Sequence, residues 1–132
     1  MSAIKRVPNP KAKKPKRKPK ASYKVADELF SKIVRLRDGY CQMCGSGDWL
    51  QCAHGFSRRY RAVRWDERNA WALCRACHTY FTHHPIEWDD WLRKEWGDLY
   101  DGIRQAALSN PNPDPAEVVA ALRIRLDALG GT

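Results

Sequence analysis

Four cysteines in two pairs carry the clearest chemistry in the sequence. Cys41 and Cys44 form one C-x2-C pair, and Cys74 and Cys77 form the other. Together they supply four thiolates, which make a complete tetrahedral shell for a zinc ion. A zinc ion with four protein ligands has no open coordination position, so we expect a structural Zn²⁺ site. The 29 residues between the pairs exceed the spacing of a simple zinc ribbon, so the zinc is expected to enclose further structure.

The enclosed segment and the residue after it contain groups suited to the hydrolysis of a phosphodiester. His54 can accept a proton from water at neutral pH, because the pKa of a free imidazole is about 6.5. His78, directly after the second cysteine pair, is a candidate ligand for a divalent ion. Asn69 lies between them. Guanidinium groups hold phosphates well, and the loop after His54 supplies Arg58, Arg59, Arg61 and Arg64.

As a set, these residues resemble the HNH endonucleases that carry a four-cysteine zinc. The likeness lies in the two C-x2-C pairs, in AHGFSRR at residues 53–59 and in WDERNAWALCRACH at residues 65–78. It covers about residues 25–97 and is greatest to phage-encoded nucleases, including recombination nucleases of the Rap type. The resemblance implies a ββα-metal (His-Me finger) fold. It also implies His54 as the general base, Asn69 as the residue that fixes the loop orienting it, and His78 as a ligand of a catalytic ion.

Each of these residues also has a plainer interpretation. His54 could be a structural histidine, His78 could cap the cysteine turn, and Asn69 could cap a helix. The arginines of the loop could form a solvated surface.

The resemblance leaves the catalytic ion short of one ligand. Many relatives have an acidic residue or a histidine directly before the general base, where this chain has Ala53. His83 is the first candidate to replace it, provided that the helix containing His78 unwinds near Pro85. A site with few protein ligands favours Mg²⁺ or Mn²⁺ over a second zinc ion. The other candidate ligands are Cys52, Asp66 and Glu67.

The positive charge of the chain is concentrated at its N-terminus. Residues 1–24 hold ten of the 24 lysines and arginines and no acidic residue, whereas the remainder has 14 basic and 15 acidic residues. Lysines interspersed with prolines over residues 1–22 predict a disordered arm that binds nucleic-acid phosphates without reading sequence. A merely solubilising tail is the alternative. The residues of the arm that we expect to contact DNA are Lys13, Lys14, Lys16, Arg17 and Lys18.

Hydrophobic spacing completes the prediction of fold. It predicts strands at residues 48–56 and around 62–65, and helices at residues 23–37, 70–84, 85–96 and 115–129. The expected class is α+β, with a small ββα-metal core held by the four-cysteine zinc and flanked by helices. The expected domains are the basic arm (1–22), the nuclease domain with its flanking helices (23–108), and a linker with a C-terminal helix (109–132).

The residues and the resemblance together predict a metal-dependent DNA endonuclease. The resemblance to phage nucleases further implies that it is phage-encoded and acts in recombination, processing or packaging of DNA. The alternative is a catalytically inactive zinc protein that binds nucleic acid, with Ala53 as the mark of lost catalysis. The expected partners are duplex or branched DNA and phage or host DNA-processing proteins. No apolar run is long enough to span a bilayer and no secretory signal is evident, so we expect a cytoplasmic location, in the bacterial host.

Overall fold

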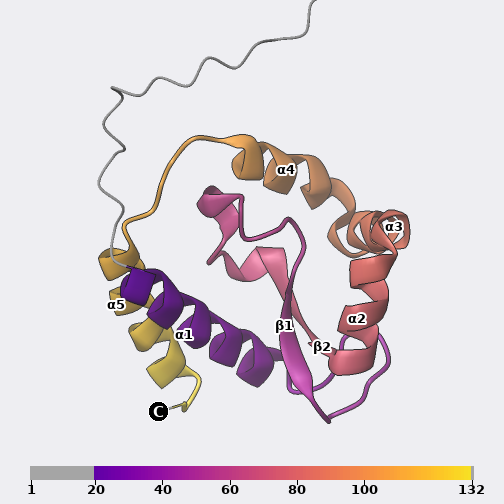
Figure 1. Cartoon of the computed structure of the whole chain (residues 1–132), viewed down its shortest axis with the longest axis horizontal. Coiled ribbons are helices and arrows are strands. Elements are labelled where there is room, and N and C mark those ends of the chain that lie inside the picture. Colours follow the sequence, from indigo (N-terminus) through magenta and orange to yellow (C-terminus); the bar gives the residue numbers. More distant parts are fainter. Residues whose placement is uncertain (1–19, 132) are drawn as a thin grey trace, which may run out of the picture.

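The computed structural model describes residues 20–131, so the DNA contacts predicted for Lys13 to Lys18 lie outside the described residues. The described chain is α+β, with five α-helices and a two-stranded antiparallel sheet (Figure 1). None of the described helices is long and apolar enough to cross a membrane. The elements are α1 (Lys20–Asp38), β1 (Leu50–His54), β2 (Ala70–Cys74), α2 (Arg75–His83), α3 (Pro85–Trp96), α4 (Tyr100–Leu108) and α5 (Pro115–Ala128), with 3₁₀ turns at Arg61–Val63, Glu67–Asn69 and Gly97–Leu99.

The sheet and the helix after it form a continuous unit. His54 at the end of β1 pairs with Ala70 at the start of β2, and Leu50 pairs with Cys74. The chain enters α2 directly from β2, where the Cys74 sulfur accepts a hydrogen bond from the backbone N–H of Cys77 and caps the helix. A strand–strand–helix unit is thus enclosed by the two cysteine pairs.

Two of the secondary-structure elements predicted from the sequence are wrong. The strand predicted around residues 62–65 is a 3₁₀ turn at Arg61–Val63, and the helix predicted from residue 70 begins at Arg75. Residues 70–74 form β2 instead, because they pair with β1 and alternate between two faces. Ala70 and Ala72 pack in the core against α1, while Leu73 packs on the opposite side with Phe81 of α2.

The two faces of the sheet are covered by different helices. One face packs on α1, and α5 lies along the far side of α1 (Figure 1). Leu122 and Leu126 of α5 share a core with Phe30 and Ile33 of α1. The C-terminal helix therefore supports the helix on which this side of the sheet rests.

The other face packs on α2 and α3, through a stripe of tryptophans on α3. Trp88 and Trp91 stack at 5.1 Å, and both contact the ring of Trp71 on β2. The indole N–H of Trp88 donates to the backbone oxygen of Gly55, and that of Trp96 donates to the backbone oxygen of Arg68. Helix α3 therefore holds both ends of the loop that joins β1 to β2.

Gly55 provides a test of this packing. A Cβ atom at this position would lie 2.6 Å from the Trp96 ring, so Gly55→Ala should lower the free energy of unfolding by about 1–3 kcal/mol. At Gly102, on exposed α4, a Cβ atom would meet nothing within 4 Å, so Gly102→Ala should leave stability unchanged or raise it slightly. Urea unfolding of both variants measures the difference, and an equal response would contradict the close approach of α3 to the loop.

Candidate functional site

The four paired cysteines lie together. Cys41 and Cys44 belong to the turn between α1 and β1, and Cys74 and Cys77 lie where β2 enters α2. Their four sulfur atoms are within 4.8 Å of one another, and those of Cys44 and Cys74 are 3.6 Å apart. Tetrahedral zinc with Zn–S bonds of about 2.3 Å requires sulfurs about 3.8 Å apart. The cluster therefore fits the predicted structural zinc in both donor type and spacing.

Backbone N–H groups favour the thiolate at Cys41, whereas burial and the neighbouring cysteines raise the pKa of Cys77. The N–H groups of Cys44 and Cys77 each point at the sulfur three residues earlier, at 3.5 Å. Gly45 adopts a φ of 82°, which allows the first turn to close with its N–H on the carbonyl of Cys41. Burial acts to raise the pKa of Cys41, but backbone donors including the N–H of Cys44 outweigh it and lower this pKa to about 6. A metal ligand of this kind must be deprotonated, so the turn is suited to its task.

The fifth cysteine, Cys52, stands apart from this cluster. It lies on β1, on the face directed at α1, two residues before His54. Burial raises its pKa to about 12, so it remains a neutral thiol near pH 7. A protonated thiol is a poor metal ligand, which makes the predicted use of Cys52 as a second ligand unfavourable.

His54 is held as a neutral base at the end of β1. Its Nε2 lies 2.8 Å from the backbone carbonyl oxygen of Arg64. A carbonyl oxygen only accepts, so Nε2 carries the hydrogen and Nδ1 of the neutral ring has a free lone pair. Burial lowers the pKa of His54 below its ordinary value of 6.5, so the ring is uncharged at neutral pH. It can therefore accept a proton through Nδ1.

Asn69 fixes the loop that positions His54. Its side chain is fully buried and makes three hydrogen bonds to the loop backbone. Its Oδ1 accepts from the N–H of Phe56 at 2.8 Å, and its Nδ2 donates to the oxygens of Phe56 and Val63 at 2.9 and 3.1 Å. Val63 precedes Arg64, whose carbonyl holds His54. Asn69 ends a 3₁₀ turn and enters a strand, so it is not the helix cap of the alternative interpretation.

His54 and His78 line one open cleft of about 600 Å³, between α1 on one side and β1 and α2 on the other. Nδ1 of His78 is 2.8 Å from the amide oxygen of Gln51. The amide oxygen accepts, so Nδ1 carries the hydrogen and Nε2 is the free nitrogen of His78. Burial lowers the pKa of His78 as well, which keeps it available as a neutral ligand.

The other candidate ligands lie outside this cleft. His83 is exposed in the last turn of α2, which stays helical through that residue, and it does not line the cleft. Asp66 binds Arg68, and Glu67 binds Arg125 of α5. Within residues 20–131, the four-cysteine cluster is the only group of three or more metal-ligating side chains close enough to share an ion. None of these three residues therefore lies beside His78 in the cleft.

Sequence reasoning missed two residues of the cleft, Gln51 and Asp27. The sequence provides a weak indication of Gln51, because it lies two positions before Ala53 and therefore on the same face of β1. Asp27, on α1, is the carboxylate among the residues lining the cleft. It accepts hydrogen bonds from Arg64, Trp65 and Arg58, and despite its partial burial these partners hold its pKa below the usual range. No local pattern distinguishes Asp27 from its neighbour Glu28.

The four arginines predicted to bind DNA differ in their surroundings. The Arg64 side chain is 18% exposed and forms two hydrogen bonds with Asp27, at 3.0 and 2.5 Å. The Arg58 side chain is 61% exposed and makes one contact with Asp27 at 3.4 Å. Arg59 and Arg61 are exposed. Arg64 is therefore engaged within the protein, whereas the other three point their charge toward solvent.

No family model, curated protein or solved structure matches the chain.

We predict about one tightly bound zinc ion per chain by elemental analysis. Cys74→Ser should lose most of this zinc and lower the unfolding temperature, because a three-thiolate shell is incomplete. Cys52→Ala is the matched control and should retain the zinc, since Cys52 lies outside the cluster. A Cys74→Ser protein that keeps its zinc and unfolds like the parent would contradict the assignment.

The burial of His54 predicts a pH dependence of stability. Its folded-state pKa lies below the unfolded value of about 6.5, so its contribution is complete above pH 6.5. As the pH falls below 6.5, the unfolded chain takes up a proton before the folded one, and stability decreases until the folded pKa is reached, by at most about 1.4 kcal/mol per pH unit. Urea unfolding between pH 5 and 7.5 should show this loss, and His54→Gln should reduce it. An NMR titration midpoint of His54 above 6.5 would contradict the prediction.

Proposed function

We propose that the chain is a metal-dependent endonuclease of the HNH type, which hydrolyses phosphodiester bonds of DNA. One observation carries the proposal: a neutral histidine with a free Nδ1, His54, shares a single open cleft with a second histidine with a free Nε2, His78. The two rings offer a proton acceptor and a metal ligand in one cleft, which are the two functions that this hydrolysis requires.

The local architecture supports assignment to the ββα-metal fold. The hairpin of β1 and β2 leads into α2, with His54 at the end of the first strand and His78 in the first turns of the helix. Asn69, buried at the start of β2, holds the intervening loop. A nucleic-acid-binding module needs arginines and a zinc cluster, but it does not need this histidine pair or the buried asparagine.

In the proposed reaction, Nδ1 of His54 accepts a proton from the water that attacks phosphorus. The bond between phosphorus and the 3′ oxygen breaks, and that oxygen takes up a proton from solvent, which leaves a 5′-phosphate and a 3′-hydroxyl. The Arg64 carbonyl bonded to Nε2 stabilises the positive charge that His54 acquires. Arg58, at the edge of the cleft, is placed to hold a phosphate beside the scissile one.

Nε2 of His78 would hold the divalent ion. When bound, such an ion relieves charge on the phosphate and on the leaving oxygen. With Ala53 apolar and His83 outside the cleft, water and phosphate oxygens would complete the shell, and this favours Mg²⁺ or Mn²⁺. The resemblance to phage nucleases implies branched or recombining DNA, or DNA that is being packaged, as the substrate.

A catalytically inactive DNA-binding protein is the second candidate, and Ala53 favours it. This residue is buried and apolar at the position where an additional metal ligand is expected. The two functions differ in whether DNA is cut, so they are separated by the experiment below.

Purified protein with Mg²⁺ or Mn²⁺ should nick supercoiled plasmid, and it should not do so when the ion is omitted or chelated. His54→Ala should lower the nicking rate at least about 100-fold, since it removes the proton acceptor. His84→Ala is the matched control, because His84 stacks on Tyr80 outside the cleft, and it should keep the parental rate. Unchanged nicking by His54→Ala would refute the mechanism, and salt-sensitive binding without cleavage of plasmid or branched DNA would favour the inactive binder.

A further inference from the structure

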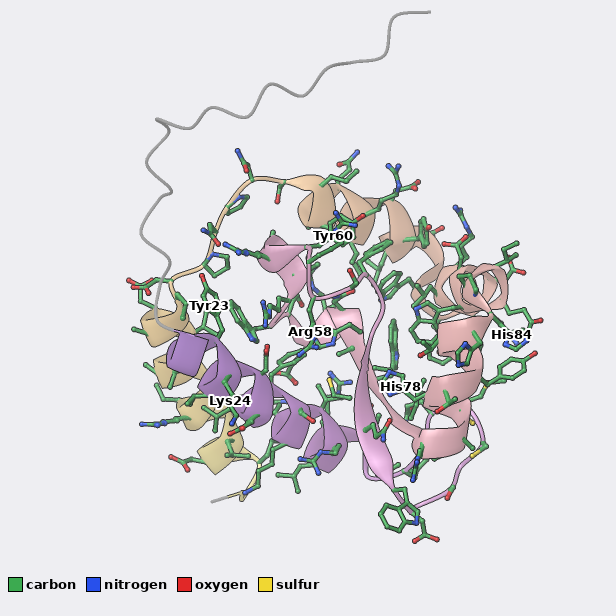
Figure 2. The ribbon with its side chains drawn as sticks, viewed as in Figure 1. Tyr23, Lys24, Arg58, Tyr60, His78 and His84 are labelled. Carbon is green, nitrogen blue, oxygen red and sulfur yellow. The ribbon has the colours of Figure 1, made fainter. Side chains whose placement is uncertain are left out.

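The histidine cleft adjoins a second recess, and the contact between Asp27 and Arg58 lies where the two meet. The recess measures about 470 Å³, lies toward the start of α1 and shares Asp27 and Arg58 with the cleft. We call the cleft and this recess together the α1 groove. Figure 2 shows Arg58 between Tyr23, which lines the second recess, and His78, which lines the first. The groove therefore extends the candidate site well beyond the two histidines.

One wall of the α1 groove is a single stripe of helix α1. Tyr23, Asp27, Ser31 and Arg35 line it at intervals of four residues, so they lie on one face of the helix. Twelve residues at 1.5 Å per residue give this wall a length of about 18 Å. The opposite wall comes from β1, from the loop after it and from His78. The groove is thus long enough for several consecutive phosphates of one nucleic-acid strand.

The groove carries exposed positive charge along this length. Its exposed cations are Lys24 and Arg61 in the outer recess, Arg58 at the junction and Arg35 beside the histidines. Its two carboxylates do not cancel them. Asp27 is engaged mainly with Arg64, and Glu28 meets Lys24 only in an exposed pair at 3.9 Å, which contributes little.

The contacts of Asp27 show that Arg64 has a structural role, whereas Arg58 remains available to a ligand. Asp27 makes two hydrogen bonds to Arg64 and a single contact of 3.4 Å to the exposed guanidinium of Arg58. A phosphate that entered the groove would compete with Asp27 for Arg58 alone, because Arg64 is half-buried and fixed. Arg58 can therefore turn to a ligand without loss of the bond that joins α1 to the loop.

The aromatic ring that lines the groove, that of Tyr23, is not free to stack on bases. The Tyr23 ring stacks on Trp65 at 5.9 Å, and the guanidinium groups of Arg61 and Arg64 lie over it at 5.6 and 5.5 Å. Trp65 also has Arg64 over its ring and donates to Asp27. These rings position cations, and the cations are what the groove offers to a ligand.

We propose that the α1 groove binds the sugar–phosphate backbone of one DNA strand and leads it from the histidines to the start of α1. The choice of DNA as the polyanion rests on the proposed function. The N-terminal segment of this chain is not a suitable occupant, because it is basic like the groove itself. It joins α1 at Lys20, at the outer end of the groove, so its positive charge directly precedes that of the groove along the sequence.

The test measures DNA binding without a divalent cofactor, so it does not depend on cleavage. The groove variant Arg58→Gln/Arg61→Gln is compared with Arg104→Gln/Arg123→Gln, whose exposed arginines lie on α4 and α5 outside the groove. All proteins carry His54→Ala, and zinc content and unfolding temperature confirm their folding. The groove variant should bind a labelled duplex at least tenfold more weakly. Its plot of log affinity against log salt should be shallower by about 1.8, for two lost phosphate contacts.

The control variant should bind with the parental affinity and salt dependence. Equal weakening of both variants would overturn the proposal, since the groove would then contribute no more than general surface charge. A groove-dependent preference for RNA of the same sequence over DNA would overturn it too. If the groove variant binds weakly and the parent chain, with His54 intact, never nicks DNA, the groove is supported and the proposed nuclease function is refuted. If the parent chain nicks DNA and the groove variant binds with the parental affinity, only the groove proposal is refuted.

Discussion

The buried amide of Asn69 is the constraint on which the candidate site depends. The loop between β1 and β2 contains only short 3₁₀ turns, so much of its backbone has no regular hydrogen-bonding partner. Asn69 forms hydrogen bonds with the backbone of Phe56 at the start of the loop and of Val63 in its middle. These bonds also pair all the polar atoms of the Asn69 side chain. An apolar residue here would leave these groups unpaired in the interior, at about 1–3 kcal/mol each. Arg64, whose carbonyl sets the tautomer of His54, directly follows Val63, so Asn69 helps to hold that carbonyl in place.

Two fixed points therefore hold the hairpin, one at each end. Asn69 fixes the loop where His54 meets Ala70, and the four cysteines fix the opposite end, where Leu50 meets Cys74. Four residue steps along β1 separate these points by about 13 Å. His54 lies beside the first point and His78 directly follows the second, so each histidine is positioned by a different constraint. Asp27 adds a third connection, because Arg64 binds α1 through its side chain and His54 through its carbonyl.

The sequence predicted best those features that depend on local spacing. The two C-x2-C pairs predicted the cysteine cluster, and hydrophobic spacing predicted the helix at residues 85–96, because metal ligation and helix periodicity are short-range patterns. The segment AWALC at residues 70–74 was predicted wrongly as helix. Five small and apolar residues fit either state, and pairing with β1 decides between them. Asp27 and Gln51 could not be identified with confidence from sequence, since their partners Arg64 and His78 lie 37 and 27 residues away.

Ala53 has a physical consequence for the proposed enzyme. Its side chain is 2% exposed and packs with Leu73 and Phe81, so a carboxylate here would need to be desolvated beside an apolar core. The neutral Gln51, on the same face of β1, binds His78 instead. Asp27 is committed to Arg64, so the cleft offers a divalent ion a neutral imidazole but no uncommitted carboxylate. The negative charge that such an ion requires would then come from the phosphates of the DNA, which the cations of the α1 groove attract. Under the proposed function, DNA and the ion should therefore bind cooperatively, because each supplies charge that the other lacks.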